Sequence, residues 1–145
     1  MNKLPGRSTS IVIAFDFGRK SIGVAVGEKS LATANELTPL KANNGVPDWE
    51  VIGALIDEWE PGAVLVGLPL NMDGSDQDMT RRARKFARRI QGRFRHLHVQ
   101  MVDERLSTRE AKTIAHERGH SGNYAKQPLD SISARLLLES WWAEQ

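Results

Sequence analysis

The stretch that decides the fold is residues 11–26, IVIAFDFGRKSIGVAV. It holds two short apolar runs rich in β-branched residues, 11–15 and 21–26, joined by a glycine-containing turn at 17–20. Runs of this length and composition predict buried strands, and so short a connection predicts that they pair as a hairpin. Asp16 is the first charged residue of the stretch and ends the first strand.

The segments that follow the hairpin alternate between strand and helix patterns. Residues 31–37 predict a third strand, and 41–47, with an Asn-Asn-Gly breaker, predict a loop. Asp48 is a typical helix N-cap, because apolar residues recur after it with the spacing of one helix face. Pro61 and Gly62 are predicted to end that helix.

The rest of the chain predicts a mixed α/β domain. A strand is predicted at 63–66, a loop at 67–75, a helix at 76–94, a strand at 97–102, a helix at 107–118, a loop at 119–127 and a closing helix at 129–142. Strands joined through helices run parallel, whereas the opening hairpin is antiparallel. We therefore expect a flexible N-terminal tail at 1–10 and a single domain at 11–145, with a mixed central sheet flanked by helices.

The composition excludes several classes of protein. A chain of 145 residues with 40% hydrophobic and 26% charged residues is long and apolar enough for one folded domain, and is not a disordered or collagen-like chain. It has no cysteine, which excludes disulfides, thiol nucleophiles and Cys-ligated metals. No apolar run approaches the ~20 residues of a membrane helix, so we expect a soluble, cytoplasmic protein that has no membrane partner.

The net charge of +2 is uninformative, but the distribution of charge is not. Residues 81–95 carry eight basic side chains and no acid. These are Arg81, Arg82, Arg84, Lys85, Arg88, Arg89, Arg93 and Arg95. Such a run is often only a solvated helix face, yet it lacks the acidic partners that surface helices use at i,i+4. It is equally compatible with a helix that contacts the phosphates of a nucleic acid.

Acidic residues stand at positions that parallel strands would bring to one edge of the sheet. Asp16 ends the first strand, Asp103 and Glu104 follow the strand at 97–102, and Asp130 opens the last helix. Ligand sites in open α/β sheets lie beyond the carboxyl ends of the strands. Carboxylates without His or Cys suit a hard divalent cation, Mg²⁺ above all or Mn²⁺.

Each of these signals also has a purely structural explanation. A strand-end Asp often forms a turn, and Asp130 could be only a helix N-cap. Asp103 and Glu104 are adjacent and point to opposite sides of an extended chain, so one of them is expected to enter a site. The sequence Asp16-Phe17-Gly18 also opens the phosphate-binding hairpins of actin-like ATPases and sugar kinases, so a phosphotransferase stays an alternative.

Four segments together resemble a known family. They are AFDFG at 14–18 with IGVA at 22–25, GLPLNMDGS at 67–75, DERLST at 103–108 and DSISA at 130–134. In this order they resemble the YqgF family, also called RuvX, which is described as Holliday junction resolvases and as nucleases that mature the 5′ end of pre-16S ribosomal RNA. The resemblance extends from about residue 11 to residue 142.

The resemblance implies an RNase H-like fold and a metal-dependent site made of Asp16, Glu104 and Asp130. It implies a hydrolase, an endonuclease that cleaves phosphodiester bonds in structured nucleic acid, with processing of pre-16S rRNA in ribosome biogenesis as the first expectation. A Holliday junction resolvase and a non-catalytic nucleic-acid-binding module are the alternatives, and the protein is expected as a monomer or homodimer. The residues expected to contact nucleic acid are Lys20, Asn71, Arg81, Arg84, Lys85, Arg88 and Arg105.

The chain departs from the family pattern at a few positions. Ser21 stands where a basic residue is usual, Ser133 replaces an alanine, and Arg135 lies where an apolar residue is common. None of these changes removes a carboxylate.

Overall fold

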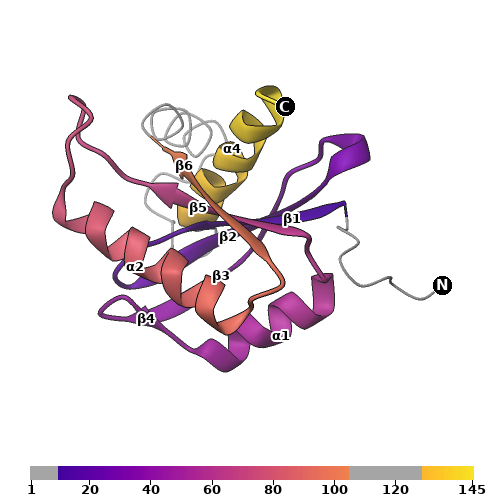
Figure 1. The fold of residues 1–145 in the computed structure, drawn as a ribbon, viewed down its shortest axis with the longest axis horizontal. Helices are drawn as coiled ribbons and strands as arrows, with labels where there is room; N and C mark the ends of the chain where they lie inside the picture. The colour runs from indigo at the N-terminus through magenta and orange to yellow at the C-terminus, as the bar shows by residue number, and fades with distance from the viewer. Residues whose placement is uncertain (1–9, 105–128) are drawn as a thin grey trace.

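The computed structural model describes residues 10–104 and the closing helix, whose backbone begins at residue 129. Its centre is a six-stranded sheet in the order β4-β3-β2-β1-β5-β6 (Figure 1). The strands are β1 (Ile11–Asp16), β2 (Ser21–Glu28), β3 (Asn35–Asn43), β4 (Val46–Pro47), β5 (Ala63–Leu68) and β6 (His98–Asp103). A 3-10 turn, η1 (Lys29–Leu31), lies between β2 and β3.

The pairing of the strands follows the sequence prediction. β1 and β2 form the expected antiparallel hairpin, with Phe15 opposite Val24. β5 and β6 run parallel to β1, because each is reached through a helix that returns the chain to the same edge. The carboxyl ends of β1, β5 and β6 therefore lie together at one edge of the sheet.

Two faces of the sheet are covered by different helices, as Figure 1 shows. Helices α1 (Trp49–Trp59) and α2 (Asp78–Arg93) cover one face, and α4 (Leu129–Ala143) covers the other. Strand residues alternate between the two resulting cores. Ile13, Phe15, Val64 and Val66 pack in the α1/α2 core, and Val12, Ala14 and Leu65 pack against α4.

The predicted helices begin and end close to where the sequence placed them. The Asp48 side chain caps α1 by accepting a 3.0 Å hydrogen bond from the Glu50 backbone N–H. The helix predicted at 76–94 is α2, whose buried residues include Ala83, Phe86, Ala87 and Ile90. The predicted helix at 107–118 and the loop at 119–127 lie outside the described residues, as does most of the tail at 1–10.

The sequence prediction was wrong between residues 31 and 47. The third strand begins at Asn35 instead of residue 31, and the predicted loop at 41–47 is the β3–β4 hairpin. β3 exists because it pairs with β2, a contact that local composition does not encode. Asn44 and Gly45, predicted as loop breakers, both have positive φ, which is the backbone that a two-residue hairpin turn requires.

Arg135, a departure from the family pattern, has a local explanation. It lies on α4 and forms a 3.3 Å ion pair with Glu36 of β3, both side chains being mostly buried. The charge is thus paired where α4 crosses the sheet.

None of the described helices is long and apolar enough to cross a membrane.

Candidate nuclease site

Asp16 and Glu104 lie on the α4 face of the sheet, at the edge where the parallel strands end. Alternation along β1 turns Val12, Ala14 and then Asp16 toward α4, and along β6 it turns Val102 and then Glu104 the same way. The Glu104 backbone N–H continues the ladder by donating to the Leu68 carbonyl at 3.3 Å. Two of the predicted carboxylates therefore share one face and one edge.

Gly67 leaves room for the Glu104 carboxylate beside the end of β1, the strand that ends in Asp16. A Cβ built on Gly67 would lie 2.1 Å from Glu104 Oε2, so this oxygen occupies the space where a side chain of β5 would begin. Gly67 follows Val66, the parallel partner of Phe15, and so stands beside Asp16 on a strand ~4.8 Å away. Glu104 Oε2 is shielded from solvent. The absence of a side chain at Gly67 therefore leaves space for the Glu104 carboxylate on the strand next to Asp16.

The third predicted acid lies at the start of α4. Asp130 is the second residue of α4, and its side chain lies outside the described part of the structure. The next residue, Ser131, is buried, and its Oγ accepts a 3.3 Å hydrogen bond from the Val24 backbone N–H. Val24 pairs with Phe15, so the start of α4 is fixed within a residue or two of Asp16.

Asp103 is separated from this group, as the sequence analysis expected for one of the two adjacent acids. It pairs with Leu68 in the β5–β6 ladder and is exposed. Alternation turns it toward the α1/α2 face, away from Glu104. Among the described residues, which do not include the Asp130 side chain, no group of three or more His, Asp or Glu side chains could hold a metal ion.

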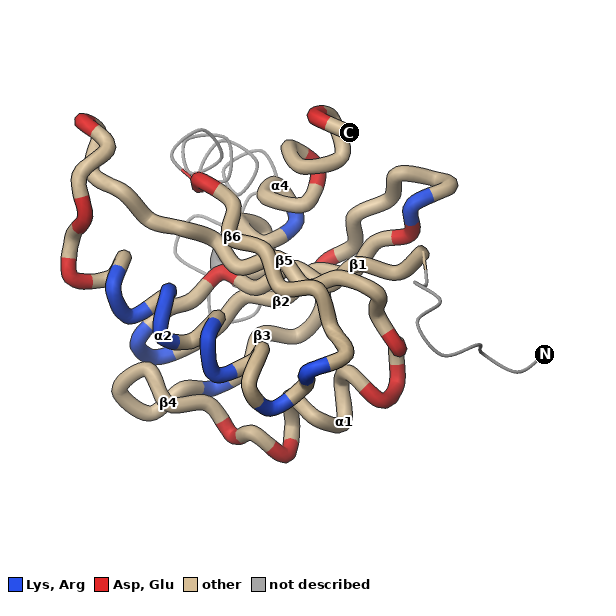
Figure 2. Tube along the Cα trace, viewed as in Figure 1, with Lys and Arg blue, Asp and Glu red and all other residues tan. Residues whose placement is uncertain are grey.

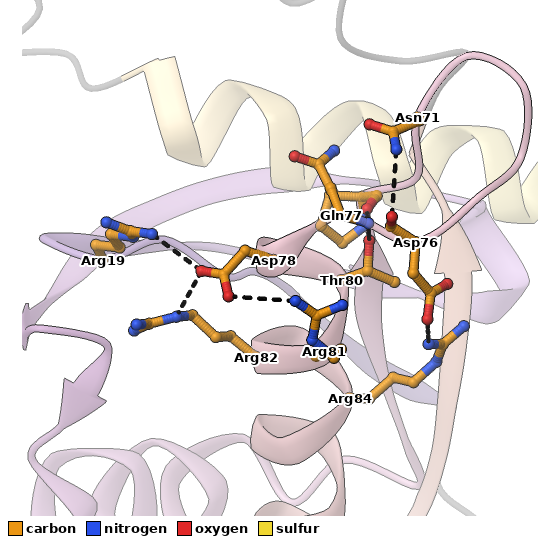
Figure 3. A network of polar contacts seen from close by, with 10 residues as sticks. Arg19, Asn71, Asp76, Gln77, Asp78, Thr80, Arg81, Arg82 and Arg84 are labelled. Carbon is orange, nitrogen blue, oxygen red and sulfur yellow. Dashed lines mark hydrogen bonds and ion pairs between the residues drawn. The ribbon is translucent and has the colours of Figure 1, made fainter.

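The basic residues of α2 form the largest concentration of positive charge in Figure 2. The N-terminal part of this run is neutralised locally, contrary to the expectation that it lacks acidic partners. Asp78 forms ion pairs with Arg19 at 3.0 Å, Arg81 at 3.6 Å and Arg82 at 3.1 Å, and Figure 3 shows the three guanidinium groups around it. Acids before the run, rather than within it, supply the partners.

Asp76 and Asn71 organise the loop that precedes α2. Asp76 pairs with Arg84, and this hydrogen bond holds the pKa of Asp76 below its ordinary value. The predicted nucleic-acid ligand Asn71 donates through Nδ2 to Ser75 Oγ at 3.0 Å. It also donates to the Asp76 carbonyl at 3.2 Å, as Figure 3 shows. Asn71 therefore closes its own loop.

The remaining predicted contact residues differ in what surrounds them. Lys20 is exposed in the β1–β2 turn, and Lys85 and Arg88 are exposed on α2. Within the described part of the chain neither Lys85 nor Arg88 forms an ion pair. Arg105 lies outside the described residues.

Gly67 belongs to the 67–75 segment quoted for the family resemblance, but the sequence analysis gave it no part in the candidate site. It was assigned to a loop, whereas it lies inside β5. A glycine that ends an apolar strand run is a known sign that another group approaches the backbone closely. That signal was present in the sequence and points to this site.

Comparison with known proteins shows the family of this chain. The family model described as "RuvX: Holliday junction resolvase" matches residues 10–144. The chain belongs to the RuvX family. A RuvX relative from Saccharophagus degradans is 56% identical over 137 residues, which are 94% of this chain and 96% of the relative, and is named "Putative pre-16S rRNA nuclease". A relative from Chromohalobacter salexigens with the same name is 54% identical over 92% of this chain and 90% of its own length.

Solved resolvase structures share the fold of this RuvX chain. Thermus thermophilus RuvC in complex with a Holliday junction substrate has a TM-score of 0.55 at 19% identity, covering 92% of this chain and 94% of RuvC. The fowlpox virus Holliday junction resolvase has a TM-score of 0.54 at 15% identity, covering 92% and 97%. The RNase H-like fold expected from the sequence is confirmed.

Proposed function

We propose that this RuvX protein is a metal-dependent endonuclease that cleaves phosphodiester bonds of structured nucleic acid and processes the 5′ end of pre-16S rRNA. Relatives that are 56% and 54% identical carry that rRNA nuclease name. Bacterial rRNA is transcribed in the cytoplasm, which is where the protein would act. Family membership favours this function over the actin-like phosphotransferase that Asp16-Phe17-Gly18 also suggested.

The observation that carries the proposal is the position of the Glu104 carboxylate. Its Oε2 occupies the space above Gly67, beside the strand that ends in Asp16 and on the sheet face that α4 covers. The proposed site joins this carboxylate to that of Asp16, and two carboxylates on one face at one edge of the sheet suit a divalent cation with oxygen ligands.

Asp16, Glu104 and Asp130 would hold Mg²⁺ or Mn²⁺. Their donors are all carboxylate oxygens, the ligands that these hard cations prefer. Bound there, the ion would supply an activated water and stabilisation of the leaving oxygen in phosphodiester hydrolysis. The protein's own contribution is position: the β1–β5–β6 register and the Ser131 anchor of α4 set where the acids stand.

The basic residues would hold the substrate backbone. Lys20, Lys85 and Arg88 are exposed cations suited to phosphate contact. Arg81 forms an ion pair with Asp78, and Arg84 forms one with Asp76. Exposed ion pairs contribute little to stability, so either arginine would bind a phosphate by giving up its pair with the acid. Arg105 follows Glu104 directly, and Asn71 acts by shaping the loop before α2.

A second candidate is cleavage of four-way DNA junctions. The family description names Holliday junction resolvases, and the similar Thermus RuvC was solved with such a junction. A two-fold junction would be cut most simply by a homodimer, whereas an rRNA leader requires only a monomer. The measured oligomeric state on each substrate separates the two functions.

The test compares cleavage of three substrates: a pre-16S 5′ leader, a four-way junction and an unstructured single strand. Wild-type protein with Mg²⁺ or Mn²⁺ should cut the leader. Asp16→Asn and Glu104→Gln should reduce cleavage to background, while circular dichroism and RNA binding stay close to wild type. Asp103→Asn is the matched control, since it removes the same charge one residue away on the opposite face, and it should cut normally.

Two outcomes contradict the proposal. Cleavage that survives in purified Asp16→Asn protein would remove the carboxylate site from the reaction. Binding of the leader without cleavage by wild-type protein at millimolar Mg²⁺ and Mn²⁺ would favour the non-catalytic binding module.

A further inference from the structure

A pocket of about 320 Å³ lies between the β3–β4 turn and α2. Its apolar part is lined by Phe17, Trp49 and Phe86, and its cationic part by Arg82, Lys85 and Arg89. It is separate from the carboxylate group, which faces α4. The pocket could not be predicted from local sequence patterns, because the β3–β4 hairpin that closes one side depends on strand pairing.

The rings of the pocket pack against one another, with Phe17 and Phe86 buried and Trp49 partly exposed. Phe86 contacts Phe17, with ring centroids 5.2 Å apart, and Trp49, with centroids 6.0 Å apart. The guanidinium of Arg93 lies 4.4 Å from the centre of the Trp49 ring. A surface fixed in this way binds a planar group without first paying to order its side chains.

The cationic part comes from one stripe of α2. Arg82, Lys85 and Arg89 are spaced at i, i+3 and i+7, which places them on one side of the helix. Asp78 holds Arg82 at 3.1 Å. Lys85 and Arg89 are exposed, and within the described residues neither forms an ion pair. Two cations beside the aromatic surface are thus available to an anionic ligand.

The pocket adjoins the edge of the sheet that carries the acids. Phe17 follows Asp16 directly and is buried on the α2 side, whereas Asp16 faces α4. The β3–β4 turn is tied to the same place, since the Gly45 N–H donates to the Arg19 carbonyl at 2.8 Å and the Ala42 N–H to the Lys20 carbonyl at 2.9 Å. A strand cut at Asp16 would have its neighbouring nucleotides within reach of this pocket.

We propose that this pocket binds one unpaired nucleotide of the nucleic-acid substrate, with the base against the partly exposed Trp49 and its phosphate on Lys85 and Arg89. The inference rests on the proposed nuclease function and adds a specificity site to it. A duplex backbone presents only phosphates and ribose and would not use the aromatic surface, and a lone phosphate would use only the cations. A base with its phosphate uses both, and the volume lies in the range of small-ligand pockets.

The test measures binding in EDTA, so that no substrate is cut. Fluorescence anisotropy compares an RNA duplex with the same duplex carrying one unpaired nucleotide, and a free mononucleotide serves as competitor. Wild-type protein should bind the bulged RNA about tenfold more tightly, in line with the worth of one stacked base. The Lys85→Ala/Arg89→Ala variant should lose most of this preference.

Arg88→Ala is the matched control. It removes a neighbouring exposed cation that does not line the pocket, and it should weaken both RNAs equally, because phosphate contacts are independent of an unpaired base. Photo-crosslinking from 4-thiouridine at the bulge should label Trp49 or the β3–β4 turn in the wild-type protein.

Several results would overturn the proposal. They are equal binding of both RNAs by wild type, equal loss of preference in Arg88→Ala, or crosslinks only outside the pocket. Pocket-dependent binding of the free mononucleotide without any preference for bulged RNA would assign the pocket to a small ligand instead. Cleavage is scored separately with Mg²⁺, so an active enzyme with no bulge preference refutes this site while leaving the nuclease function standing.

Discussion

Gly27 and Gly67 have similar positions in their strands, but the oxygen atoms that lie against them belong to different kinds of group. Each lies in a strand with its missing side chain directed at α4, and each has an oxygen where that side chain would begin. A Cβ on Gly27 would lie 1.9 Å from the Thr33 backbone oxygen, and one on Gly67 would lie 2.1 Å from Glu104 Oε2. By sequence alone both are glycines near the end of an apolar strand.

The two oxygens differ in how freely they move. The Thr33 carbonyl belongs to main chain that is held on several sides. It accepts a 2.8 Å hydrogen bond from Trp142 Nε1, and Thr33 Oγ1 accepts a 2.9 Å bond from the Glu28 backbone N–H. Glu104 Oε2 ends a flexible side chain. The fold therefore requires Gly27, whereas the proposed site requires Gly67.

Of the substitutions that test this difference between the two glycines, Gly67→Ala is expected to have the largest effect on cleavage. The new methyl group should turn the Glu104 carboxylate away and leave the strands in place. Cleavage should fall about 100-fold or more, because small misplacements in a catalytic site cost that much. The free energy of unfolding, measured with urea, should change by less than ~1 kcal/mol, because a flexible side chain can yield.

Gly92→Ala is the control for Gly67→Ala. Gly92 is exposed on α2, and a Cβ there would meet no atom within 4 Å. It should cut at the wild-type rate and gain up to ~1 kcal/mol of stability from helix propensity. A wild-type cleavage rate in Gly67→Ala would refute the role given to the Glu104 position.

The opposite pattern is expected from Gly27→Ala. Because the clashing atom is backbone, β2 and the segment at Thr33 must separate, which should cost about 2 kcal/mol of unfolding free energy. Cleavage per folded molecule at low temperature should stay within a factor of about two of wild type. A loss of cleavage with unchanged urea stability would break the distinction between the two glycines.

The parts of the fold that the sequence predicted well are those whose signal is local. The β1–β2 hairpin and the buried stripe of α2 follow from apolar periodicity, and Asp48 caps α1 as its residue type and position indicated. The β3 strand was misplaced because it depends on pairing with β2. The Asn44-Gly45 turn was visible as a hairpin signal but was weighed only as a breaker.

The candidate site also has features that local sequence predicts and features that depend on pairing between distant strands. The sequence shows that Asp16 ends a strand and that Glu104 follows one, but whether the two acids lie close together depends on the parallel register that sets Phe15 beside Val66 and Gly67 beside Val102. No periodicity encodes register between distant strands. The acid-free basic run suggested free cations, yet Asp78 precedes the run and pairs with its first members.

Ser131→Ala should have a smaller effect than Gly67→Ala or Gly27→Ala. It tests whether the contact that fixes the start of α4 serves the fold, as Gly27 does, or the proposed site, as Gly67 does. Ser131 Oγ accepts from the Val24 N–H at 3.3 Å and donates to the Leu37 carbonyl at 2.7 Å, bridging β2 and β3 next to the register shift between Ile22 and Val24. Alanine would strip both buried groups of this partner and cost about 1 kcal/mol of unfolding free energy. Ser131 also fixes the start of α4 next to Asp130, so cleavage should fall several-fold. Added Mn²⁺ should restore part of the cleavage, because a higher metal concentration fills a proposed metal site that binds the ion more weakly. A stability loss with no change in cleavage at limiting Mg²⁺ would show that the α4 anchor serves the fold alone, as Gly27 does.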